Sequence, residues 1–150
     1  MRLSALNWSA TRVLWAWVLG FGSLALSAAE PESLAIQGYD TVAYFTEGRA
    51  LRGDPRYTLT WDEHRWQFAS AEHRSMFKAD PVRFAPQFAN FCAVALAQGE
   101  VKAANPEYWL ISEGRLYLFG KSVGPSLFKS SLERNIELAN QHRDLIRRAQ

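Results

Sequence analysis

The residues with the clearest chemical potential are one cysteine and three histidines. A structural zinc site needs four Cys or His ligands at short paired spacings, and Cys92, His64, His73 and His142 show no such pairing. We therefore exclude a closed zinc site. Because soft sulfur and imidazole suit copper, a weaker copper site that uses Cys92 and His73 stays open as a hypothesis. We interpret His64 as a solvated turn residue and His142 as part of a polar helix face.

The thiol could instead be a nucleophile. Cys92 would then need a base such as His73 and an orienting carboxylate such as Asp40. None of these residues lies in a known nucleophile motif. We expect no catalysis and keep a thiol-dependent enzyme that uses Cys92 as an alternative.

Aromatic side chains offer a third kind of chemistry, a pocket with an apolar wall and a few polar tips. The residues concerned are Tyr39, Tyr44, Tyr57, Trp61, Trp66 and Trp109. The simpler interpretation is that they fill the core. Both interpretations hold if Tyr39, Asp40 and Tyr44 approach Cys92 at the margin of one cavity. This hypothesis makes Tyr39, Asp40 and Tyr44 the ligand-binding residues.

The N-terminal segment has the pattern of an export signal. Arg2 and Arg12 precede an apolar run from Val13 to Leu26, and small residues follow up to Ala29. The run is shorter than the roughly 20 residues of a membrane-spanning helix, so we predict a signal peptide over residues 1–29, with an uncleaved anchor as the alternative. The predicted location is the periplasm or the exterior, with one domain over residues 30–150 and no membrane span after cleavage.

The charge balance argues against some partners. Residues 1–29 hold two of the 17 basic residues and none of the 15 acidic ones, so the remaining chain has equal numbers of both. A balanced chain without a basic run has no electrostatic signature for nucleic acid. With a single cysteine, the chain can form no internal disulfide. The oligomeric state is not indicated.

Local patterns predict the elements that must position these residues. Alternating apolar residues in 57–68 and apolar runs in 109–119 predict two β-hairpins, and Ser70 is a predicted cap for a helix through Phe77. Asp80 and Pro81 should begin another helix, and the segment 91–97 is compatible with a strand or a short helix. Phe77, Phe84 and Phe88 should meet the first hairpin.

The end of the chain completes the predicted fold. After Pro125, apolar residues recur at steps of three or four, which predicts an amphipathic C-terminal helix. The expected fold class is therefore α+β, a small single domain with two β-hairpins packed against short helices and this C-terminal helix.

Several motifs resemble those of the secreted YHS-domain family. They are Gly38 to Phe45, Trp66 to Phe77, Asp80 to Phe88, and Phe91-Cys92-Ala93. The resemblance covers about residues 34 to 119. It implies an α+β domain related to metal-handling proteins, in which two metal-binding cysteines stand at the positions of Ala69 and His73.

The combined expectation is an exported YHS-like module that binds a small ligand or a metal ion, copper being the leading metal, without catalysis. The two alternatives are the thiol-dependent enzyme and a structural or interaction domain that has no ligand.

Overall fold

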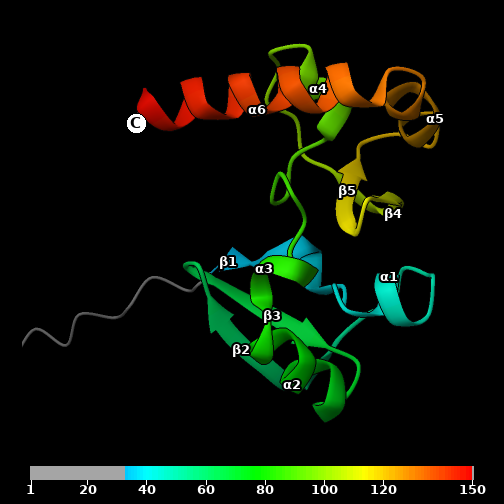
Figure 1. Ribbon diagram of the computed structural model, residues 1–150. Coiled ribbons are helices and arrows are strands. Elements are labelled where there is room, and N and C mark those ends of the chain that lie inside the picture. Colours follow the sequence, from blue (N-terminus) through cyan, green and yellow to red (C-terminus); the bar gives the residue numbers. More distant parts are fainter. Residues whose placement is uncertain (1–32, 150) are drawn as a thin grey trace, which may run out of the picture.

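The computed structural model describes residues 33–149 and has the predicted α+β fold class (Figure 1). The predicted signal peptide, residues 1–29, lies outside the described residues. The elements in chain order are β1 (Ser33–Leu34), the 3-10 helix η1 (Ala35–Gly38), α1 (Ala43–Thr46), β2 (Asp54–Trp61), β3 (His64–Phe68), α2 (Ala71–Ala79), α3 (Pro81–Phe84), α4 (Ala93–Ala97), β4 (Asn105–Ser112), β5 (Arg115–Phe119), α5 (Gly124–Lys129) and α6 (Leu132–Arg148). None of the helices within residues 33–149 is long and apolar enough to cross a membrane.

Both predicted hairpins are present. Strands β2 and β3 pair antiparallel, and β1 adds to β3 in parallel, which gives the order β1-β3-β2. Strands β4 and β5 form the second, two-stranded sheet. Asp62 and Glu63 turn the first hairpin with φ of 51° and 61°, and Glu113 and Gly114 turn the second with φ of 52° and 71°. Two consecutive left-handed residues give the turn twist that matches that of the strands.

The helix caps also follow the prediction. The Ser70 side chain accepts a hydrogen bond from the His73 amide at 3.1 Å and begins α2. Asp80 accepts one from the Arg83 amide at 3.1 Å, with Pro81 in the first turn of α3. The sequence of segment 91–97 is compatible with a strand or a short helix. The structure has the short helix α4 there, which begins directly after Cys92.

The β4–β5 hairpin lies between two hydrophobic clusters. One face of β5, with Leu116 and Leu118, belongs to a first cluster that contains Phe68 and Phe77 from β3 and α2. The opposite face of β5 joins a second cluster around α4, α5 and α6. Side chains alternate across a strand, so an unbroken apolar run suits a strand covered on both faces.

One predicted contact is wrong. Phe77 and Phe84 belong to the first cluster, but Phe88 belongs to the second, where its ring lies 5.9 Å from that of Tyr117. The reason is that α3 ends at Phe84 and Ala85 is extended, so the chain leaves the first cluster. Residues 85–91 then run past β5, where the Gln87 amide donates to the Leu116 carbonyl at 2.8 Å.

Candidate functional site

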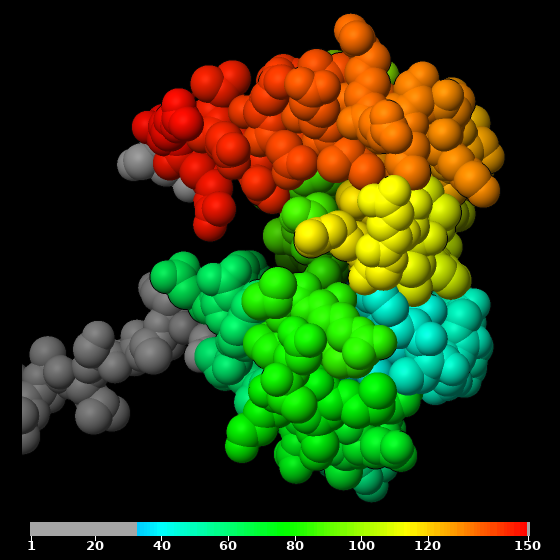
Figure 2. All heavy atoms as spheres, viewed as in Figure 1, coloured from blue at the N-terminus to red at the C-terminus, as the bar shows by residue number. Residues whose placement is uncertain are grey.

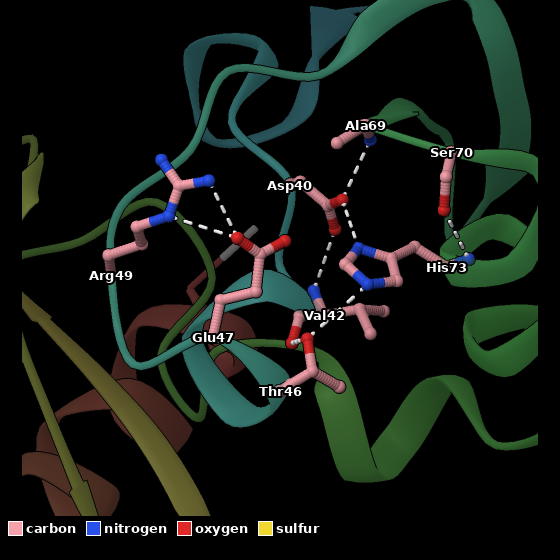
Figure 3. A network of polar contacts seen from close by, with 8 residues as sticks. All are labelled: Asp40, Val42, Thr46, Glu47, Arg49, Ala69, Ser70 and His73. Carbon is pink, nitrogen blue, oxygen red and sulfur yellow. Dashed lines mark hydrogen bonds and ion pairs between the residues drawn. The ribbon is translucent and has the colours of Figure 1, made fainter.

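The first site predicted from the sequence is centred on a buried carboxylate. Asp40 is fully buried. Its Oδ1 accepts a hydrogen bond from the Val42 amide at 2.9 Å, and its Oδ2 accepts from the Ala69 amide at 2.7 Å and lies 2.6 Å from His73 Nδ1 (Figure 3). Asp40 thereby caps the Val42 amide at the start of α1. The same carboxylate also ties α1 to the end of β3 and to α2.

His73 completes this network. It lies in the first turn of α2, where the Ser70 cap holds the helix start. Since Asp40 accepts at Nδ1, that nitrogen carries the hydrogen, and Nε2 faces Thr46 Oγ1 at 3.3 Å. Thr46 Oγ1 also lies 3.2 Å from the Val42 carbonyl. Both ring nitrogens of His73 thus lie close to an oxygen of the protein, and only 13% of the side chain is exposed.

The side chains of Tyr39 and Tyr44, the two tyrosines predicted to bind a ligand, make hydrogen bonds to strand β4. Tyr39 Oη donates to Glu107 Oε1 at 2.5 Å, and Arg52 lies 4.4 Å from the centre of the Tyr39 ring. The hydrogen bond to Glu107, together with burial, raises the pKa of Tyr39. Tyr44 Oη donates to the Pro106 carbonyl at 2.9 Å, and burial raises the pKa of Tyr44 strongly. Both tyrosines therefore anchor the start of β4 to the first cluster.

Cys92 lies apart from these residues. It is a buried member of the second cluster, whereas Tyr39 and Tyr44 belong to the first. Its amide donates to the Lys102 carbonyl at 2.8 Å, and its Sγ lies against Gly120. The structure brings Asp40 and His73 together, but it does not bring the thiol to them. Within residues 33–149, no three or more His, Cys, Asp or Glu side chains form a group that could hold a metal ion.

A cavity of about 380 Å³ lies elsewhere, between the turn of the first hairpin and the C-terminal part of α6. Figure 2 shows the hollow between the red end of α6 and the green hairpin. Its apolar wall contains Trp61 and Trp66, whose ring centres are 5.9 Å apart, with Phe88 and Phe91 from the connecting segment 85–91. Phe91 is 39% exposed, so part of its ring is accessible. We refer to this hollow as the cleft.

The cleft also carries polar groups. Arg143 and Arg147 line it from α6, and His64 and Asp62 line it from the hairpin turn. Arg143 lies 5.9 Å from the centre of the Phe88 ring, a distance at which a cation–π contact holds the guanidinium at the wall. The turn is held by a contact of 2.6 Å between His64 Nδ1 and the Asp62 carbonyl.

Asn90 joins the cleft to the first cluster, to which Ile36 and Ala104 belong. Its Oδ1 accepts from the Ile36 amide at 2.7 Å, and its carbonyl accepts from the Ala104 amide at 2.7 Å. It lines the cleft as well. With Oδ1 engaged, the side-chain NH₂ group is the part of Asn90 that can serve a ligand.

Sequence reasoning missed the cleft as a site. His64, interpreted from the sequence as a solvated turn residue, is half-buried at the start of β3, directly after the hairpin turn, and lines the cleft. The available signal was Arg143 and Arg147 at a spacing of four on the predicted C-terminal helix, which places both on one helix face. Tyr39, Asp40, Tyr44, His73 and Cys92 do not line the cleft.

Comparison with known proteins finds no relative of this chain. No family model, no curated protein and no solved structure matches the chain.

Proposed function

We propose that this protein is an exported, YHS-like module that binds a small ligand in the cleft and performs no catalysis. The observation that carries the proposal is the cleft, a hollow of about 380 Å³ with an aromatic wall and a few polar side chains. Small-molecule sites in proteins are typically about 300–1,000 Å³, mostly apolar, and equipped with a few polar groups that orient the ligand.

The Asp40 network supports the choice of the cleft as the binding site, because the polar groups of Asp40 and His73 already have partners within the protein. The carboxylate of Asp40 accepts from two amides and from His73, and the second nitrogen of His73 faces Thr46. A buried polar network whose members satisfy one another holds elements in place. We therefore assign Asp40 and His73 to the architecture and the cleft to binding.

A small organic ligand is favoured over the copper ion expected from the sequence. Cys92, one of the two proposed copper ligands, directly precedes α4 and belongs to the second cluster, whereas His73 lies on α2 and is engaged by Asp40. The β4–β5 hairpin lies between α4 and α2 (Figure 1). A copper site needs several soft or imidazole donors that converge on one point.

Native mass spectrometry of the protein purified from the exported fraction tests the proposal. We expect the mass of a chain that begins at residue 30, accompanied by a bound compound of low mass, and no stoichiometric copper. Phe91→Ala should lose the bound compound, because it removes an exposed part of the cleft wall. Leu127→Ala removes another exposed apolar side chain, on α5 and outside the cleft, and should retain it.

Two results would contradict the proposal. One is copper bound at one ion per chain and lost in Cys92→Ala. The other is the absence of any copurifying compound, combined with the absence of any shift in melting temperature across a diverse set of small molecules.

A further inference from the structure

We infer that the ligand of the cleft is an amphipathic anion, a compound with a flat or chain-like apolar body and one carboxylate-type group. This inference rests on the proposed function and specifies its ligand. The apolar body would lie against Trp61 and Trp66, and the acidic group would face Arg143 and Arg147.

The cationic side of the cleft comes from one face of α6. Arg143 and Arg147 are four residues apart, so they lie one turn from each other on the same side of the helix. Within residues 33–149, the Arg147 side chain makes no hydrogen bond or ion pair. Among the described residues, the one ion pair of Arg143 is with the neighbouring Asp144, at 3.3 Å through Nε, and its guanidinium also lies 5.9 Å from the centre of the Phe88 ring. Its terminal nitrogens therefore stay available for an anion.

The described lining of the cleft holds more cationic than acidic side chains. Among the described residues that line it, Asp62 is the one carboxylate, against the two guanidinium groups of Arg143 and Arg147, and Asp144, which pairs with Arg143 at 3.3 Å, does not line the cleft. His64 lies on the same turn and engages the Asp62 carbonyl through Nδ1, which leaves Nε2 free to contact a ligand. The part of the lining that the structure describes thus has two arginines against one aspartate, although the chain outside residues 1–29 is balanced.

The aromatic wall of the cleft indicates what the apolar body of the ligand should look like. The rings of Trp61 and Trp66 are inclined by 56°, and the Trp66 indole donates to the Trp61 carbonyl at 3.0 Å, which fixes it in the hairpin. A rigid aromatic wall beside guanidinium groups selects a ligand that offers apolar area and negative charge side by side.

Isothermal titration calorimetry with two probes of equal shape tests the inference. The probes are 2-naphthoate, which is an anion, and 2-naphthamide, which is neutral. We expect 2-naphthoate to bind roughly three- to tenfold more tightly, because partly exposed guanidinium groups make charge-assisted bonds that water screens in part. Raising the salt concentration from 0.05 to 0.5 M should reduce this preference.

Three variants locate the charge effect. Arg143→Gln and Arg147→Gln should each weaken 2-naphthoate binding about threefold and leave 2-naphthamide binding unchanged. Arg148→Gln makes the same charge change on the exposed end of α6, outside the cleft, and should leave both affinities unchanged. Circular dichroism and melting curves should be the same for all three variants, because each residue is at the surface or at the rim of the cleft.

The results separate this inference from the proposed function. Equal binding of the two probes, or an equal effect of Arg148→Gln and Arg147→Gln, overturns the amphipathic anion and leaves the small-ligand module standing. Failure of both probes to bind also overturns it, since the cleft is large enough for either. The proposed function fails separately, by the mass-spectrometric result described above.

Discussion

Replacing Asp40 by Asn is the most informative test of the architecture. The change keeps the size of the side chain and removes one acceptor oxygen. Three donors converge on the two oxygens of Asp40, namely the Val42 amide, the Ala69 amide and His73 Nδ1. An Asn side chain offers one oxygen, so its NH₂ group must face at least one of these donors.

The size of the effect follows from the burial of the site. Asp40 is fully buried, so water cannot replace the lost acceptor. An unsatisfied buried donor costs about 1–3 kcal/mol, and loss of a charged partner in a buried pair costs more. We expect Asp40→Asn to reduce the free energy of unfolding by about 3 kcal/mol, which lowers the melting temperature by about 12 °C in a domain of this size.

Urea unfolding monitored by circular dichroism measures this loss by linear extrapolation. Asp144→Asn is the matched control, since that carboxylate is half exposed and, among the described residues, pairs with Arg143 alone, at 3.3 Å. A double-mutant cycle of Asp40→Asn with His73→Ala should give a coupling energy of about 1 kcal/mol or more. A loss below about 1 kcal/mol in Asp40→Asn, or additive effects in the cycle, would refute the network as the brace between α1 and α2.

Two further predictions concern Tyr44 and Cys92. Burial raises the pKa of Tyr44, whereas an unfolded tyrosine ionises near pH 10, so stability should be retained below about pH 10 and lost as the pH rises above it. Tyr44→Phe should reduce that alkaline loss while costing about 1 kcal/mol at pH 8 through the lost bond to the Pro106 carbonyl, as urea midpoints at pH 8 and 10.5 would show. Cys92 is buried, so iodoacetamide should modify it roughly tenfold or more slowly in the native protein than in urea. Equal rates in the two states would contradict its place in the second cluster.

The elements that could be predicted from the sequence are those specified by neighbouring residues. Ser70 and Asp80 cap their own helices, and each hairpin turn is built from two adjacent residues. The cap of the Val42 amide by Asp40 is equally local. Such features depend on contacts over two to four residues, which a single sequence shows directly.

The partners of the predicted site residues depended on tertiary structure. Asp40 and His73 are 33 residues apart, and only the tertiary fold, which places the first turn of α2 beside the segment before α1, brings them together. The hypothesis that Cys92 shares the margin of one cavity with the phenols assumed a tertiary contact that no local pattern shows, and the β4–β5 hairpin lies between the two clusters that hold them. A continuous apolar run such as residues 116–119 indicates burial on both faces but does not say which elements cover each face.

Different physical constraints act on the motif Gly38 to Phe45 and on the cleft. Asp40 and Tyr44 are buried and make specific bonds to the backbone of distant segments, so few other residue types fit their positions. The cleft takes its wall from the turn after β2, the connection before α4 and the last turns of α6, none of which forms a motif by itself. A fold of this kind can retain its motif while the charges and aromatic groups of the cleft change, since the rim side chains Phe91 and Arg147 are not needed for the two clusters. Motif residues such as Asp40 and Tyr44 therefore stabilise the fold, and we expect the residues that determine which ligand binds to lie where α6 faces the first hairpin.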